Sequence, residues 1–179
     1  NGDGGDETPV EENAVVGTWT LTPAAGTLAV GPNDGDYSWW TSDAAVVTDR
    51  ACFFDDTWTF ESSEPGAANG TFTIDQGAET WLEGWQNGTD QEFCGAGVAP
   101  FTGGTFDWAY DETAGTLTVS GSAPGAYLGL PKANNDGEIS TGTAPTSTIT
   151  YTVNSLTSSA LEIKIQAGGA WWRFRLSKQ

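Results

Sequence analysis

Tryptophan is the residue type in this chain that most suggests ligand binding. The chain has nine tryptophans in 179 residues and neither histidine nor methionine. Six of the nine form three pairs: Trp39-Trp40, Trp81 with Trp85, and Trp171-Trp172. Neighbouring side chains on a strand point to opposite faces, so an adjacent pair cannot place both rings in one core. An exposed indole is a flat apolar surface with a polar N–H at its edge, and it suits stacking on a sugar ring. The tryptophans therefore favour glycan binding.

Residues 79–86 carry the most specific arrangement. On a regular strand Trp81, Glu83 and Trp85 would share one face, with the indoles roughly 13 Å apart and the carboxylate between them. The alternative is that this face belongs to the core, but burying Glu83 without a partner would be costly, so we expect it to be exposed. The candidate carbohydrate-binding residues are the rings not needed for the core and the charged residues on their faces: Trp39, Trp40, Trp81, Glu83, Trp85, Trp171 and Arg173.

Other chemistry is restricted by composition. Without histidine, Ser-His-Asp, Cys-His and histidine-ligated metal sites are excluded. A glycosidase needs only two suitably spaced carboxylates, which Asp55-Asp56 or Glu79 with Glu83 could supply. Adjacent acids are expected anyway in a chain with 24 Asp and Glu, so we predict a non-catalytic domain. The run 33–36, Asn-Asp-Gly-Asp, lacks EF-hand spacing and favours a plain turn; a structural calcium ion is possible, and no other cofactor is expected.

The two cysteines, Cys52 and Cys94, favour one disulfide over two buried thiols, given an exported-looking composition. A bridge of this length would stabilise the fold by roughly 4 kcal/mol in the chain-entropy model. We expect an extracellular or outer-membrane surface location. The acidic, glycine-rich opening at residues 1–13 indicates a disordered linker from a longer multidomain precursor, and the isolated domain should be monomeric.

Charge excludes several partners. Six Lys and Arg against 24 Asp and Glu give a formal charge of −18, which repels nucleic acid and anionic membranes. An anionic polysaccharide is disfavoured too, unless calcium or a local arginine patch reverses the field. No run of 18 apolar residues exists, so no membrane insertion is expected. Among polysaccharides, this charge favours a neutral one over an anionic one.

The elements that would position these residues are strands. Alternation with a period of two marks nine runs, separated by Gly, Asn, Asp and Pro clusters. They are Val15–Thr22, Asp56–Phe60, Thr71–Ile74, Thr80–Gln86, Thr105–Tyr110, Thr116–Ser120, Thr148–Val153, Leu161–Gln166 and Ala170–Leu176. No segment keeps a 3.6-residue period, so no helix is predicted. Residues 14–179 should form one all-β domain, an antiparallel sandwich or flattened barrel, with long loops at 24–55, 87–104 and 121–145 gathered at one end.

The same alternation assigns the core. Apolar residues two apart on a run should share the inner face. The predicted sets are Trp19 and Leu21; Trp58 and Phe60; Phe72 and Ile74; Phe106, Trp108 and Tyr110; Ile149, Tyr151 and Val153; Leu161, Ile163 and Ile165; and Trp172, Phe174 and Leu176. Trp171, Arg173 and Arg175 should then point outward. So many large side chains predict a filled interior.

Two resemblances add to these inferences. Gly17-Thr18-Trp19 and the stretch Tyr151–Ile165 resemble the bacterial lipocalin-like domains, which implies a meandering antiparallel barrel or sandwich. A lipocalin-type binder would hold a small apolar ligand inside the barrel.

A second set of short sequence segments is spread over nearly all of residues 14–178. It comprises Ser38-Trp39-Trp40, residues 50–56, Glu79-Thr80-Trp81, residues 125–133 and residues 171–174. These resemble accessory domains of marine Bacteroidetes that occur beside family 16 glycoside hydrolases and in surface glycan-binding lipoproteins. The resemblance implies a module that binds laminarin, a β-1,3-glucan. The rival hypotheses are a small carboxylate-dependent glycan hydrolase, the lipocalin-type binder and a structural spacer.

Overall fold

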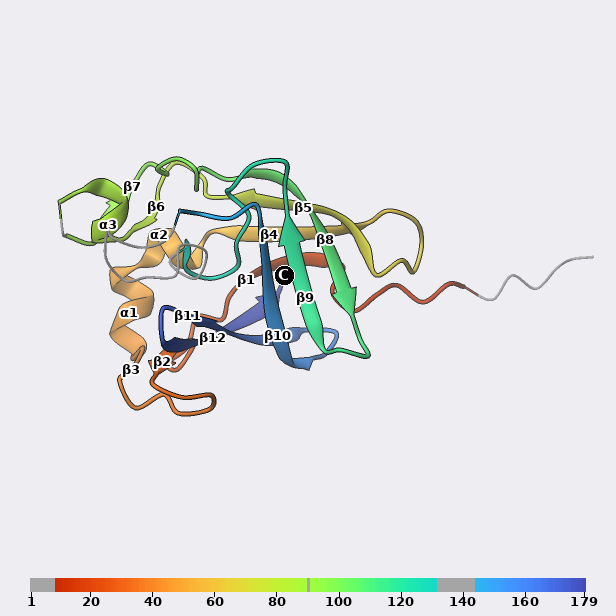
Figure 1. Ribbon diagram of the computed structural model, residues 1–179, viewed down its shortest axis with the longest axis horizontal. Helices are drawn as coiled ribbons and strands as arrows, with labels where there is room; N and C mark the ends of the chain where they lie inside the picture. Colours follow the sequence, from red (N-terminus) through yellow and green to blue (C-terminus); the bar gives the residue numbers. More distant parts are fainter. Residues whose placement is uncertain (1–8, 90, 132–143) are drawn as a thin grey trace, which may run out of the picture.

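The computed structural model describes residues 9–89, 91–131 and 144–179, and its centre is a closed antiparallel barrel (Figure 1). Eight strands follow one another around it in the order β1, β4, β5, β8, β9, β10, β11, β12, and β12 pairs with β1 to close the ring. They are β1 Gly17–Leu21, β4 Thr57–Ser62, β5 Asn69–Asp75, β8 Gly104–Asp111, β9 Thr116–Ser120, β10 Thr148–Leu156, β11 Ala160–Ala167 and β12 Ala170–Lys178. The predicted all-β class is confirmed, in the form of a barrel and not a two-sheet sandwich.

Two insertions build one end of the barrel, which we call the mouth. Strand β2 (Leu28–Gly31) pairs with β12 and carries β3 (Trp40–Thr41), while β6 (Thr80–Leu82) and β7 (Phe93–Gly95) form a separate hairpin. Figure 1 shows both insertions, together with the helices, at the same end of the barrel. Residues 9–13 run to β1 from the opposite end without regular structure, and residues 1–8 of the predicted linker lie outside the described residues.

The three helices correct the prediction that the chain has none. They are α1 Ala44–Asp49, α2 Ala51–Phe54 and α3 Gly84–Asn87. Each is too short for a 3.6-residue period to show in the sequence. Asp43 caps the N-terminus of α1. Its carboxylate accepts hydrogen bonds from the N–H groups of Ala45 and Val46 at 3.0 and 3.2 Å. None of the helices in the described part of the chain is long and apolar enough to span a bilayer.

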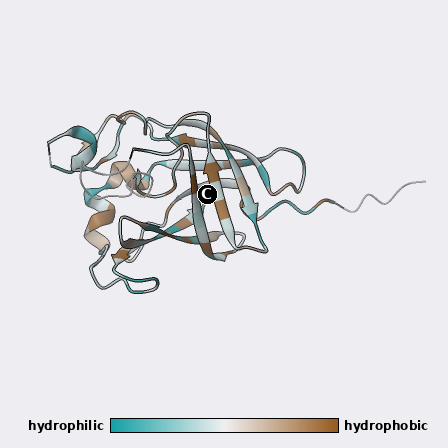
Figure 2. Ribbon diagram, in the orientation of Figure 1, coloured by the Kyte–Doolittle hydropathy of each residue, from teal (hydrophilic) through white to brown (hydrophobic). Residues whose placement is uncertain are grey.

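The barrel interior is filled by the predicted core. Hydrophobic and hydrophilic residues alternate along the barrel strands in Figure 2, as a half-buried sheet requires. Most predicted core residues are buried: Trp19, Leu21, Trp58, Phe60, Phe72, Ile74, Trp108, Ile149, Tyr151, Leu161, Ile163, Trp172, Phe174 and Leu176. Four others, Phe106, Tyr110, Val153 and Ile165, are partly buried against this core.

Part of the β9–β10 connection enters the barrel, and we call residues 125–130 the plug. Residues 126–128 and 130 are almost fully buried. The Tyr151 hydroxyl fixes the plug by accepting the Leu128 N–H at 2.8 Å and donating to the Leu128 carbonyl at 3.1 Å. Gly129 is required here, because its φ is +68° and a β-carbon would lie 2.5 Å from the Phe174 ring. Residues 132 and 133 of the resemblance phrase lie outside the described residues.

Candidate functional site

A pocket of about 280 Å³ opens at the mouth. Its lining residues come from β2, the β2–β3 connection, β3, the junction of α1 and α2, the segment before β7, the plug and β12: Val30, Trp39, Trp40, Arg50, Glu92, Leu130 and Trp172. Trp39 is the most exposed of the three indoles, at 59 %, and Trp172 is the least, at 3 %. The pocket thus combines an exposed aromatic ring, an ion pair and an apolar floor.

Arg50 occupies the centre of this arrangement. Its guanidinium carbon lies 4.5 Å from the centroid of the Trp81 ring and 5.5 Å from that of Trp40, within the range of cation–π attraction. The same group forms an ion pair with Glu92 at 3.4 Å. Burial lowers the pKa of Arg50, and the charges of Glu92 and Glu83 oppose that shift, so the guanidinium stays charged. Two indoles therefore hold a planar group with several N–H donors beside the pocket.

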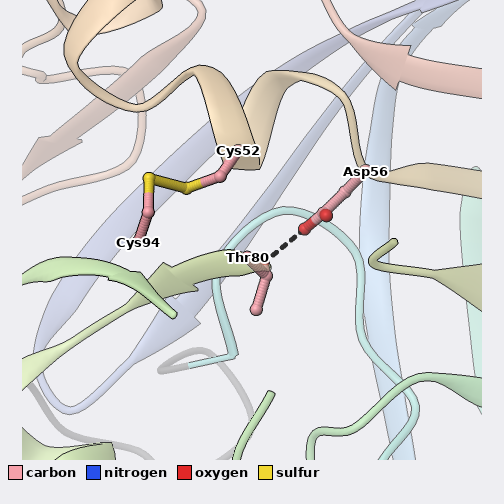
Figure 3. The surroundings of a disulfide bond; sticks show 4 residues. All are labelled: Cys52, Asp56, Thr80 and Cys94. Carbon is pink, nitrogen blue, oxygen red and sulfur yellow. Dashed lines mark hydrogen bonds between the residues drawn. A yellow bond between two sulfur atoms is a disulfide. The ribbon is translucent and has the colours of Figure 1, made fainter. Parts of the chain in front are cut away.

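The disulfide ties the two halves of this cluster together. The predicted Cys52–Cys94 bond is present, and Figure 3 shows it joining α2 to the β6–β7 hairpin. Arg50 stands two residues before Cys52 and Glu92 two residues before Cys94, while Trp81 is the cross-strand partner of Cys94. The bond therefore joins the segment that carries Arg50 to the hairpin that carries its ring and acid partners.

The predicted common face of Trp81, Glu83 and Trp85 is wrong. Strand β6 ends at Leu82, Glu83 is the N-cap of α3, and Trp85 lies on that helix. The Glu83 side chain is buried, whereas the sequence pattern predicts that it is exposed. Its carboxylate accepts a hydrogen bond from the Trp85 indole at 3.1 Å, and its backbone N–H bonds to Gln86. The indole of Trp85 packs edge-on against Phe101 at 5.9 Å, outside the residues that line the pocket.

The remaining candidates divide between the pocket and the outer wall. Trp39 and Trp40 line the pocket. Trp171 and Arg173 point away from the barrel interior, as predicted, and so lie on the opposite side of β12 from Trp172. The amine of Lys164 lies 5.7 Å from the Trp171 ring, and the Arg173 guanidinium lies 4.6 Å from the ring of Tyr37. The seven predicted residues are therefore not one site.

Sequence reasoning missed Arg50 and Glu92. A signal for both was present, because the predicted disulfide brings residues near Cys52 and Cys94 together. Arg50 is also one of only six Lys and Arg residues in the chain. Because each lies two residues before a cysteine of the predicted disulfide, that prediction also places Arg50 close to Glu92.

In each predicted pair of catalytic carboxylates, one member is exposed and the other is buried. Asp56 and Glu83 are almost fully buried, whereas Asp55 and Glu79 line a separate hollow beside the disulfide. The Thr80 hydroxyl donates to one oxygen of Asp56 at 2.5 Å, as Figure 3 shows, and the other oxygen has no hydrogen-bond partner among the described residues. Burial, together with the charges of Asp55 and Asp75, raises the pKa of Asp56 to about 8 against the lowering effect of the Thr80 hydrogen bond.

Asp56 should make stability depend on pH. Its pKa is raised from 3.8 to about 8, so between these values the folded chain holds a proton that the unfolded chain has lost. Its stabilising contribution is fully present below pH 3.8 and is lost as the pH rises to about 8. The corresponding slope is about 1.4 kcal/mol per pH unit. As the pH rises through this interval, the free energy of unfolding of Asp56→Asn should increase relative to that of wild type by this amount per pH unit. Urea unfolding at several pH values measures the difference. Parallel stability curves for the two proteins would contradict the assignment.

The acidic run at 33–36 forms a turn, as favoured from the sequence. Asn33 and Asp36 form an isolated bridge, and the Asp34 carboxylate accepts hydrogen bonds from Lys164 at 2.7 and 2.8 Å. The described residues contain no group of three or more Cys, Asp or Glu side chains placed to hold a metal ion. A structural calcium ion stays an untested prediction.

Comparison with known proteins gives weak structural likenesses. No protein-family model matches the chain, and no curated protein matches it. One similar solved structure is a lipocalin-like protein from Bacteroides uniformis, with 15 % identity and a TM-score of 0.40 over 93 % of this chain and all of the other. Another is an uncharacterized protein from Bacteroides eggerthii, with 11 % identity and a TM-score of 0.37 over 92 % of this chain and 98 % of the other. The closed barrel itself is defined by the strand pairing.

Proposed function

We propose that the domain captures a neutral glycan without cleaving it, and that a sugar ring sits in the mouth pocket. The observation that carries this proposal is the exposed Trp39 indole beside Arg50, which Trp40 and Trp81 hold between them. Stacking on the indole would bury the apolar face of one sugar ring of the glycan, and the guanidinium and the Glu92 carboxylate offer donors and acceptors for hydroxyl groups of the ring in the pocket.

A neutral glycan suits the charges of the site better than an anionic one. Among the described residues, the cation that lines the pocket is Arg50, which is already paired with Glu92, and the chain as a whole carries −18. A polyanion would therefore gain little from Arg50 and would be repelled at longer range. Among neutral glycans we propose laminarin, the β-1,3-glucan that the sequence resemblance implies. Capture at the cell surface or outside the cell is part of the same proposal.

Affinity electrophoresis tests this function directly. We expect the protein to be retarded in gels that contain laminarin, and less in gels with mixed-linkage glucan, starch or mannan. Reducing-sugar release measured alongside should stay at the level of the buffer blank. Absence of retardation in every gel would contradict glycan capture. Release of reducing sugar would instead support the hydrolase alternative.

Replacing Trp39 by alanine should weaken laminarin binding. Loss of one stacking ring is expected to cost about 1–3 kcal/mol, by analogy with stacking of nucleic-acid bases on aromatic side chains. This corresponds to a roughly 5- to 150-fold rise in Kd, measured by isothermal titration calorimetry. The stability of the variant should barely change, because the ring is 59 % exposed.

Trp171→Ala is the matched control for Trp39→Ala. It removes a second indole that is partly exposed, from the outer wall and not from the pocket. Its affinity for laminarin should equal that of wild type. If Trp171→Ala loses affinity and Trp39→Ala does not, the sugar lies on the outer face of β12 and the assigned pocket is wrong.

The small-ligand alternative has one observation in its favour. The floor of the pocket is apolar, formed by Val30, Leu130 and Trp172 at the mouth of a barrel, a common place for small-molecule sites. This alternative predicts that the apolar dye Nile red binds and that laminarin does not displace it. Glycan capture predicts retardation by laminarin whether or not the dye binds.

A further inference from the structure

The mouth pocket is closed at its inner end. Val30, Leu130 and Trp172 form its floor and are only 5, 1 and 3 % exposed. Behind them the barrel is occupied by the plug and by Phe174, which approach each other so closely that Gly129 admits no side chain. Within the described part of the chain, the interior beyond the floor is packed core. A ligand that enters at Trp39 therefore meets a wall and has no second exit through the barrel.

Side chains from separate segments form the rim of the pocket. Trp39 comes from the β2–β3 connection and Trp40 from the start of β3. Arg50 comes from the junction of α1 and α2, and Glu92 from the segment before β7. The Arg50–Glu92 ion pair and the disulfide two residues beyond each partner join the α1–α2 junction to the segment before β7. Arg50 also lies 5.5 Å from the centroid of the Trp40 ring. The polar groups thus belong to the wall of a pocket and are not spread along a surface groove.

The volume of the pocket is also small. About 280 Å³ lies just below the range of roughly 300–1,000 Å³ that is usual for drug-sized ligands. A pocket of this size admits a single sugar ring and not a run of linked rings. A second ring could still lie outside the rim, where 59 % of Trp39 faces solvent.

We infer that the pocket recognises the end of a glycan chain and not its interior. This inference rests on the proposed function. A polysaccharide that binds through an internal ring needs room for the chain on both sides of that ring, whereas a pocket that is closed at its inner end and has the volume of one ring suits a terminal residue. Arg50 and Glu92 then bond hydroxyl groups of the terminal ring, and Trp39 stacks on the penultimate one. Binding through an end gives one protein molecule per end, whatever the chain length.

Linear and cyclic glucans separate the two modes. We would titrate the protein with linear β-1,3-gluco-oligosaccharides of increasing length and with a cyclic β-1,3-glucan, which has no ends. Chain-end recognition predicts one protein per linear chain at every length, a Kd that stops improving once the second ring is present, and at least tenfold weaker binding of the cyclic glucan. Stoichiometry that rises with length, or cyclic and linear glucans bound equally well, would overturn it.

The Trp39→Ala variant supplies an internal check on the same titration. In this variant the gain in affinity from the monosaccharide to the disaccharide should disappear, while the stoichiometry stays at one. A gain that persists in the variant would contradict the assigned place of the second ring. If the proposed function itself is wrong, the titration gives a different result: neither linear nor cyclic glucans bind to the wild-type protein.

Discussion

Trp172→Ala should destabilise the domain by about 3–5 kcal/mol, because it removes a large buried ring and leaves a cavity. The indole is 3 % exposed and stacks on Phe174 with the ring centroids 5.9 Å apart. It also forms part of the pocket floor, so the variant should lose laminarin affinity in its folded fraction. Urea unfolding followed by circular dichroism measures the first effect, and calorimetric titration below the transition measures the second.

Its neighbour in the sequence provides the control. Trp171 lies on the opposite side of β12 and is only partly buried, so Trp171→Ala should change the free energy of unfolding by less than about 1 kcal/mol. Equal losses for the two variants would mean that the faces of β12 are not those described.

Replacing Cys52 and Cys94 together by alanine should cost about 4 kcal/mol of stability, because the bond closes a loop with a sequence separation of 42. The same variant should bind laminarin more weakly while still folded. Without the bond, the β6–β7 hairpin that carries Trp81 is no longer joined covalently to α2 beside Arg50. Thermal unfolding and titration at low temperature measure the two effects separately.

Glu92→Gln distinguishes the two roles of the disulfide. It removes the charge paired with Arg50 and keeps the Cys52–Cys94 bond. This variant should lose affinity with little loss of stability, since the pair is partly exposed to solvent. If the disulfide variant is destabilised and yet binds laminarin with wild-type affinity, the bond serves the fold alone.

The strands of the barrel could be predicted from the sequence because their core residues obey a simple rule. On β10, β11 and β12, residues two apart, such as Ile149 with Tyr151 and Leu161 with Ile163, are buried together. A period of two is enforced wherever a strand has one face in the core. Closure of the sheet into a barrel depends on the long-range pairing of β1 with β12, which local alternation does not encode.

The site was harder to predict because it lies where regular strands stop. A common face for residues 79–86 required a continuous strand. The strand ends at Leu82 and the backbone turns into α3, so the alternation of side chains between two faces stops there. The cost of burying Glu83 was overestimated, because the Trp85 indole donates to its carboxylate. Arg50 was missed because two separate segments place indoles on either side of it, and neither segment shows this alone.

The most direct test of glycan capture at the mouth uses the indole N–H signals of the nine tryptophans in a nitrogen-15 NMR spectrum. On titration with a linear β-1,3-gluco-oligosaccharide, the signals of Trp39 and Trp40 should shift most, because these rings line the pocket on the solvent side. The signals of Trp171 and Trp19 should stay in place, one on the outer wall and one in the core. Saturable shifts confined to Trp171, or no shifts at any indole, would contradict the assigned site.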